Sequence, residues 1–195
     1  MQTTFHGLEF LTAPGRVFTP RATTEALVDA ALELIEGRAV RVADVGTGSG
    51  VIGVSIAVAA PKVEVYATDV SADAVALARE NASMHGVSDR VHVFQGDLLG
   101  PVPEPVDVVV ANLPYLPEAE HRPEYDNEPP EAVYAPGDGL ESLRRLVAIC
   151  EGGKLVMPGF VVVQYRGDVV EADCQHLQEL REDLDARRAA HPAAA

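Results

Sequence analysis

The stretch Gly46-Thr47-Gly48-Ser49-Gly50 has the composition of a ligand-binding turn. It follows an apolar segment that ends at Val45 and precedes a second one that begins at Val51. Glycines allow a tight turn and let a ligand approach the main chain closely. A helix that begins after such a turn offers unpaired backbone N–H groups in its first turn. The arrangement predicts a nucleoside-type cofactor here, and glycines that serve only the turn itself are the simpler alternative.

Acidic residues stand beside this turn and at the ends of the next two expected strands. Asp44 precedes the glycine turn, Asp69 ends the second strand and Asp97 follows the third. A carboxylate at Asp69 can accept hydrogen bonds from both ribose hydroxyls, and one at Asp97 can accept from an adenine amino group. Each acid alone could also be a helix cap or a solvated turn residue. Their recurrence at three strand ends favours a nucleoside-binding crevice.

The same turn also fits part of the dinucleotide-binding fingerprint. Gly48, Gly50 and Gly53 have the spacing Gly-x-Gly-x-x-Gly, and Asp69 lies near the distance expected for a ribose-binding acid. In that fingerprint the first glycine follows the strand almost directly, which is true here of Gly46 and not of Gly48. Nothing after the fourth expected strand resembles a hydride-transfer site. NAD is therefore the weaker alternative to another nucleoside cofactor.

Alternating strand and helix patterns must position these residues. The predicted strands are 39–45, 63–68, 91–95, 106–111 and 160–164, the last after a turn at Pro158-Gly159, and the predicted helices are 24–36, 51–60, 71–85, 139–148 and 168–188. Near-continuous apolar strands that alternate with helices indicate a parallel sheet covered on both faces. We therefore expect an α/β fold, a doubly wound and mostly parallel sheet in a single domain of residues 1–195. Residues 1–23 are expected to form an N-terminal arm, residues 112–138 a long loop and residues 189–195 a frayed tail.

Charge and composition argue against several kinds of partner. The 195 residues include 15 Lys and Arg against 30 Asp and Glu, which gives a net charge of −15. This balance argues against binding to nucleic acid or to an anionic membrane surface. Cys150 and Cys174 form no CxxC pair and the six His are scattered, so we expect no metal site. The N-terminus shows no signal-peptide pattern and no apolar run is long enough for a membrane span, so we expect a cytoplasmic protein.

A motif after the fourth predicted strand makes the chain recognisable. Asn112-Leu113-Pro114-Tyr115, together with the segment from Asp44 to Gly50, resembles class I S-adenosylmethionine-dependent methyltransferases. More narrowly, the chain is similar to the HemK family of protein-(glutamine-N5) methyltransferases, which act on peptide-chain release factors. The segments Phe18 to Val28, Glu128-Pro129 and Gly137 to Leu140 also carry this resemblance. It covers residues of about 10–170 and implies a Rossmann-like fold.

The resemblance implies S-adenosylmethionine as the cofactor and a set of residues that bind it. The implied cofactor-binding residues are Asp44, Gly46, Thr47, Gly48, Ser49, Gly50, Asp69, Asp97, Leu98 and Asn112. Asp44 and the glycine turn would cradle the methionine part and the ribose, and Asp69 would hold the ribose hydroxyls. Asp97 and Leu98 would flank the adenine.

The resemblance also implies three catalytic residues, Asn112, Pro114 and Tyr115. Asn112 would accept a hydrogen bond from the target amide, the carbonyl beside Pro114 would accept the second, and Tyr115 would pack on the amide plane. An amide nitrogen is a poor nucleophile because its lone pair is delocalised. Fixing its orientation can lower a barrier by up to about 7–11 kcal/mol in favourable systems. The implied function is N-methylation of a glutamine-like amide, in a protein such as a release factor.

Two differences from the HemK family bear on assembly and function. From the segment before residue 24 we expect no N-terminal helical recognition domain, and no segment after residue 164 is predicted to form the antiparallel hairpin that closes such sheets. Strand 160–164 is then expected to end the sheet with an open apolar edge, which favours a homodimer or a partner chain. The alternative function is a methyltransferase-fold subunit recruited to small-molecule biosynthesis, acting on another nitrogen. A cofactor-binding partner of another chain, with little or no methyl transfer, is a further alternative.

Overall fold

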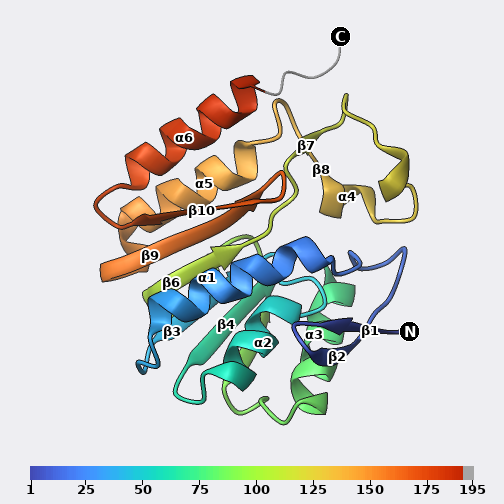
Figure 1. Ribbon diagram of the computed structural model, residues 1–195, viewed down its shortest axis with the longest axis vertical. Coiled ribbons are helices and arrows are strands. Elements are labelled where there is room, and N and C mark those ends of the chain that lie inside the picture. Colours follow the sequence, from blue (N-terminus) through green and yellow to red (C-terminus); the bar gives the residue numbers. More distant parts are fainter. Residues whose placement is uncertain (191–195) are drawn as a thin grey trace.

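A computed structural model describes residues 1–190 of the chain, with all side chains in this range except those of Met157 and Pro158. Its centre is a six-stranded sheet in the order β10-β9-β6-β3-β4-β5 (Figure 1). These strands are β3 (Arg41–Val45), β4 (Glu64–Asp69), β5 (Val91–Gln95), β6 (Val106–Ala111), β9 (Leu155–Tyr165) and β10 (Asp168–Asp173). Neighbouring strands are parallel except β9 and β10, which are antiparallel. The predicted doubly wound, mostly parallel sheet is confirmed.

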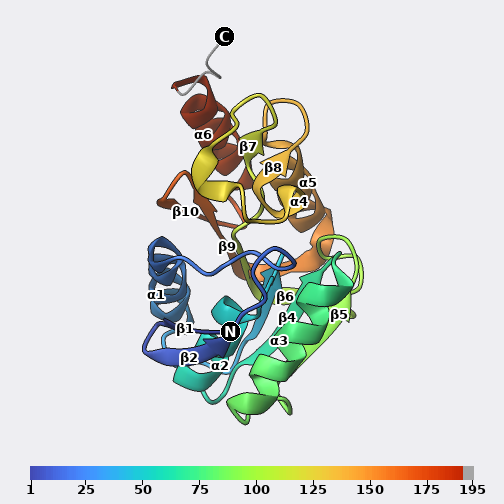
Figure 2. The same cartoon turned by 90° about the vertical axis from the view of Figure 1, so that its right-hand side faces the viewer.

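Helices cover both faces of this sheet, as Figures 1 and 2 show. One face carries α1 (Glu25–Ile35), α2 (Val51–Ala59) and α3 (Ala72–Met84), and the other carries α5 (Glu141–Ile149) and α6 (Leu177–Ala190). The strands alternate between the two cores: Val108 and Val110 of β6 belong to the first, and Val109 and Ala111 to the second. A strand whose two faces are both buried has an apolar residue at nearly every position, which explains the near-continuous apolar runs in the sequence.

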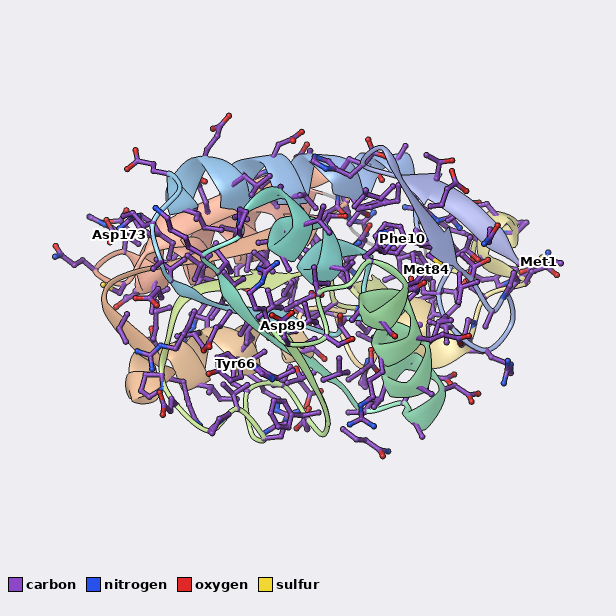
Figure 3. All side chains as sticks on the ribbon, turned by 90° about the horizontal axis from the view of Figure 1, so that it is seen from below. Met1, Phe10, Tyr66, Met84, Asp89 and Asp173 are labelled. Atoms are coloured by element: carbon purple, nitrogen blue, oxygen red, sulfur yellow. The ribbon has the colours of Figure 1, made fainter. Side chains whose placement is uncertain are left out.

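The N-terminal segment is more ordered than the predicted arm. β1 (Gln2–Phe5) and β2 (Leu8–Leu11) form an antiparallel hairpin. Its turn residues His6-Gly7 have φ of 48° and 73°, the left-handed geometry that matches the twist of a two-residue hairpin. Phe10, labelled in Figure 3, is fully buried. Its ring lies 4.9 Å from that of His85, at the C-terminal end of α3. The hairpin is therefore part of the first core.

The prediction for the C-terminal part is wrong in its first element. Residues 168–173 form β10 instead of the start of a helix, and they pair with β9 from Asp168–Tyr165 to Asp173–Phe160. Val170 of β10 and the leucines of α6 are buried in the same core, so one apolar stripe at helical spacing spans two different elements. The antiparallel hairpin that the sequence did not predict therefore exists. β9 has no open edge, and the argument from that edge for a homodimer or partner chain no longer holds.

β9 also runs through the predicted turn at Pro158-Gly159. Val106 of β6 pairs with Leu155, whereas Val108 pairs with Phe160, so β9 contains an irregularity between these two pairs. A Cβ atom at position 159 would lie 2.9 Å from the carbonyl oxygen of Asp107. Glycine therefore lets the bulged strand pass close to β6.

The long segment 112–138 is partly structured, and the predicted tail is partly helical. The segment holds β7 (Leu116–Pro117), a 3-10 turn (Pro123–Tyr125), α4 (Pro130–Val133) and β8 (Tyr134–Ala135). β7 and β8 form a small parallel pair. Residues 189 and 190 belong to α6, and the rest of the predicted tail, residues 191–195, lies outside the described residues. No helix within residues 1–190 is long and apolar enough to cross a membrane.

Candidate active site

A cavity of about 310 Å³ opens at the carboxyl ends of the parallel strands. From β3 the chain builds the sheet to one side through β4 and β5, and then to the other side through β6 and β9. The loops after β3 and β6 therefore diverge, and this switch point is where open α/β sheets bind ligands. The cavity is lined by residues 45–49 after β3, 68–71 after β4, 96–98 after β5 and 112–116 after β6. The sequence-predicted segments are thus brought together at one site.

The glycine turn owes its shape to two positions that accept no side chain. Gly46 has φ of 71°, and a Cβ atom there would lie 2.7 Å from Cδ2 of Leu113. Gly50 has φ of 83°, and a Cβ atom would lie 3.1 Å from Cα of Ala78. The backbone N–H groups of Gly46 and Thr47 both donate to Thr68 O at 2.9 Å, which fastens the turn to the end of β4. The positive φ angles and the close neighbours of these two glycines therefore set the course of the main chain past the cavity.

Asp44 lies behind the glycine turn and does not line the cavity. Its fully buried carboxylate accepts hydrogen bonds through Oδ2 from Thr47 Oγ1 at 2.6 Å and from Gly53 N at 2.9 Å. Burial raises the pKa of this carboxyl to about 6. Asp44 therefore shapes the turn and joins it to α2, and its contact with a cofactor stays a prediction. Gly50 likewise lies outside the cavity lining.

Asp69 stands at the cavity with both oxygens near the main chain. Oδ2 accepts from Gly48 N at 2.9 Å and Oδ1 accepts from Ser71 N at 2.9 Å. Each carboxylate oxygen retains a further lone pair for a ligand hydroxyl. Asp69 thus couples the glycine turn to the start of α3 and remains placed for the predicted ribose contact.

Asp97 and Leu98 follow β5 and line the same cavity. The carboxylate of Asp97 pairs with the Arg145 guanidinium of α5 and is about half exposed, at 54%. Leu98 is buried and adopts a left-handed φ of 47°. An apolar side chain next to an acceptor suits a flat heterocycle with an amino group at its edge. The adenine role of these two residues stays a prediction.

The motif from Asn112 to Tyr115 follows β6 and borders the glycine turn. Asn112 Nδ2 donates to Thr24 Oγ1 at 3.1 Å. The ring of Tyr115 meets that of Tyr165 edge-on, with centroids 5.2 Å apart. Burial raises the pKa of the Tyr115 phenol above its usual value. The three predicted catalytic residues, Asn112, Pro114 and Tyr115, all line the cavity.

The lining residues that the sequence analysis missed include Thr24 and Gln164. Both are buried, with exposed fractions of 5% and 2%, and both are polar. Gln164 follows the apolar run Phe160 to Val163 at the carboxyl end of its strand, which is the same signal that singled out Asp69. Thr24 lies in the segment that carried the family resemblance but had no role assigned to it.

A second missed feature is an aromatic and charged wall formed by the segment before α1. The Arg21 guanidinium carbon lies 4.5 Å from the ring centroid of Tyr125 and 5.4 Å from that of Phe18. The nearly buried Glu128 carboxylate accepts from Thr19 N at 2.9 Å and lies 3.7 Å from Arg21. These contacts join residues 18–21 to the long segment after β6 and close one side of the cavity.

The fold and the cavity define a doubly wound α/β protein with a nucleoside-cofactor site at its switch point. The glycine positions leave room for a ligand against the main chain, and Asp69 and Asp97 supply acceptors, so the residues present suit an S-adenosyl group. The chain belongs to the methyltransferase small domain family, whose model matches residues 8–125. Family and fold are those of class I S-adenosylmethionine-dependent methyltransferases. The cofactor of this class is S-adenosylmethionine, as the sequence resemblance implied.

Individual relatives agree with this assignment. The release factor glutamine methyltransferase of Deinococcus radiodurans is 42% identical over 153 residues, which are 76% of this chain and 54% of that protein. The crystal structure of ribosomal protein L11 methylase from Lactobacillus delbrueckii subsp. bulgaricus has a TM-score of 0.58 and 25% identity, covering 90% of this chain and 72% of that chain.

An RNA methyltransferase from Salinibacter ruber, solved in complex with S-adenosyl-L-homocysteine, shares the fold. Its TM-score is 0.55 at 22% identity, covering 81% of this chain and 94% of that one. The chain spans about half the length of the curated relatives it matches.

Proposed function

We propose that this chain methylates the side-chain amide nitrogen of a glutamine in a protein such as a peptide-chain release factor, with S-adenosylmethionine as the methyl donor. One observation carries the proposal: Asn112, Pro114 and Tyr115 line the same cavity as the glycine turn and Asp69. A target amide at the motif would therefore lie next to the predicted cofactor site. Four relatives between 38% and 42% identical are named release factor glutamine methyltransferases, which supports glutamine as the target.

The cofactor would be held by the main chain of residues 46–49 and by Asp69, with Asp97 and Leu98 beside its adenine. S-adenosylmethionine supplies an electrophilic methyl group on a sulfonium. Asp44 and Gly50 contribute indirectly, because they hold the glycine turn in its shape.

The motif after β6 has acceptors suited to an amide. Asn112 Oδ1 has no hydrogen-bond partner within the described part of the chain, and it can accept one amide N–H. The Leu113 carbonyl can accept the other, and Pro114 favours an extended Leu113, which helps to fix that carbonyl. Tyr115 would pack on the amide plane. Positive charge develops on the nitrogen as the methyl group is transferred, and acceptors already in place stabilise it without reorganisation.

The two alternative functions have less support. A small-molecule nitrogen could also occupy the motif, but the names of the relatives favour a protein glutamine. A cofactor-binding subunit with little methyl transfer would have no need of a cavity that places Asn112 and Tyr115 next to the glycine turn.

The proposal is tested by incubating the chain with a bacterial release factor and S-adenosylmethionine that carries an isotope-labelled methyl group. We expect label in the release factor, and peptide mass spectrometry should place one added methyl group on a glutamine side chain. S-adenosylhomocysteine binding, measured by calorimetry, serves as the control for a folded cofactor site. Binding of S-adenosylhomocysteine without any transfer to the release factor would refute the glutamine function and leave the fold and cofactor assignments standing.

A further inference from the structure

Three polar side chains from distant parts of the sequence, Thr24, Asn112 and Gln164, form one hydrogen-bonded relay in the cavity lining. Asn112 Nδ2 donates to Thr24 Oγ1 at 3.1 Å, and Thr24 Oγ1 donates to Gln164 Oε1 at 2.9 Å. Gln164 Nε2 donates to the backbone carbonyl of Thr23 at 2.7 Å. β6 and β9 are neighbours with Ala111 opposite Val163, so Asn112 and Gln164, the next residues along each chain segment, lie side by side. Thr24, directly before α1, bridges them.

The backbone carbonyl of Thr23, at one end of the relay, fixes which group donates in each of its hydrogen bonds. A backbone carbonyl can only accept, so the group that Gln164 turns toward Thr23 must be its NH₂. Its oxygen then faces Thr24, and the hydroxyl must donate its single proton to that oxygen. The hydroxyl has only lone pairs left for Asn112, so Asn112 must present its NH₂ to Thr24. The carbonyl oxygen Oδ1 of Asn112 is therefore the atom left for a ligand.

We propose that Thr24 and Gln164 are positioning residues that set which end of the Asn112 side-chain amide faces the target nitrogen. The two ends of such an amide have nearly the same shape but opposite hydrogen-bonding character. A flipped Asn112 would present its NH₂ to the N–H groups of the target, donor against donor. The relay disfavours the flipped Asn112, because the flip would break the hydrogen bond from Asn112 to Thr24. The buried Oγ1 of Thr24 would then have no donor.

This inference rests on the proposed function, because it assigns Asn112 Oδ1 the role of acceptor for an amide N–H. The relay is well shielded from water, since Thr24 is 5% and Gln164 is 2% exposed. Its members come from the turn before α1, the end of β6 and the end of β9, all of them packed in the central sheet or against it. Hydrogen bonds that tie Asn112 to two buried side chains between packed elements favour one arrangement of its amide, which is what orientation of a weak nucleophile requires.

Thr24→Val tests the relay, because valine keeps the shape of threonine and removes the hydroxyl. We expect kcat for release-factor methylation to fall about 10- to 100-fold, while KM for the release factor and the Kd of S-adenosylhomocysteine stay close to wild type. Thr24→Ser restores a hydroxyl and should recover most of kcat. Thr12→Val is the matched control, since Thr12 is also buried, at 8% exposed, but lies outside the cavity lining.

A spectroscopic readout separates failure of the relay from failure of the glutamine function. In ¹⁵N-labelled protein, the Asn112 side-chain NH₂ should show a shifted, slowly exchanging proton in wild type and Thr24→Ser that Thr24→Val loses. Wild-type kcat in a folded Thr24→Val protein would overturn the positioning role and leave the proposed function intact. If the wild-type protein methylates no glutamine, the proposed function fails. Asn112 NH₂ signals that are the same in wild type and Thr24→Val would overturn the relay, whatever the outcome for methylation.

Discussion

Asn112 is the residue on which the proposed chemistry depends most directly, since its Oδ1 is the acceptor that the relay leaves for a ligand. We expect Asn112→Ala to lower kcat about 100-fold, because an acceptor aimed at developing charge acts mainly in the transition state. The Kd of S-adenosylhomocysteine should change much less, and calorimetry alongside steady-state kinetics measures both. A variant with wild-type kcat would remove Asn112 from the mechanism.

Asp69 carries the prediction for cofactor affinity. Asp69→Ala removes the predicted ribose acceptor and its bonds to Gly48 and Ser71. We expect binding of S-adenosylhomocysteine to weaken by roughly 1.5–3 kcal/mol, the usual contribution of a hydrogen bond to a charged group. Asp89→Ala is the control, because Asp89 is exposed and lies outside the cavity lining. An unchanged Kd in calorimetry would reduce Asp69 to a turn residue.

Asp44 makes the stability of the protein depend on pH. Its pKa is about 6 in the folded chain against 3.8 for an ordinary carboxyl, so between these values the folded state binds more protons than the unfolded state. The contribution of Asp44 to the free energy of unfolding therefore falls as pH rises through this window, by on the order of 3 kcal/mol.

Asp44→Asn removes this titration while its side-chain oxygen can still accept from Thr47 and Gly53. Urea unfolding of both proteins across the window should show the variant gaining stability relative to wild type as pH rises. A difference that is the same at every pH would show that Asp44 does not titrate there.

At the scale of elements, Glu120 joins the long segment after β6 to the β9–β10 hairpin and to α6. Its carboxylate, with its side chain only 10% exposed, receives hydrogen bonds from Arg166 at 2.6 Å and from Arg188 at 3.0 Å. Glu120→Gln removes the negative charge that the nearly buried guanidinium groups of Arg166 and Arg188 share. We expect the free energy of unfolding in urea to fall by roughly 3 kcal/mol. Glu118→Gln, at an exposed position in the same segment, should leave it unchanged.

The sequence was most informative where one element has one pattern. The residues of β5 and β6 were predicted with their observed bounds, because each is a short run rich in valine that polar or turn residues flank. The sequence predicted one helix over 168–188, where the structure has β10 and α6. Val170 of β10 and Leu177 of α6 have helical spacing in the sequence but belong to different elements that meet in the same core. The β1–β2 hairpin was missed because its strands are four residues long and its turn, His6-Gly7, is a weak signal.

The candidate site was predictable in part for a related reason. Asp69, Asp97 and Asn112 stand at strand ends, and parallel strands bring such residues to one edge. Asp44 stands within its strand, and nothing in the sequence says that its side chain turns away from the cavity. The pairing of Thr24 with Asn112 and Gln164 depends on where α1 packs, which no local pattern encodes.

At the scale of the whole molecule, the structure changes the expectation for assembly. β10, not the apolar β9, ends the sheet, and its residues include the charged Asp168, Glu171 and Asp173. Asp173, labelled in Figure 3, lies near the margin of the molecule. Charged edge strands discourage pairing between sheets. We expect a monomer of 20.7 kDa by light scattering during size exclusion. A dimer mass at micromolar concentration would mean that a surface other than this edge mediates association.

The hydrogen-bonded relay also has a use as a sensor. Thr24 and Asn112 precede the exposed positions Glu118 and Ala119, and Gln164 follows them, so a cut between these two positions would divide the relay between two fragments. The N-terminal fragment would keep the glycine turn and Asp69, and the C-terminal fragment would bring the strand that orients Asn112. Methyl transfer would then require the two halves to reassemble around the sheet. If the halves do not associate unaided, fusing each to one of two interacting proteins would turn their encounter into a methyl mark, a split reporter whose output is a stable covalent change.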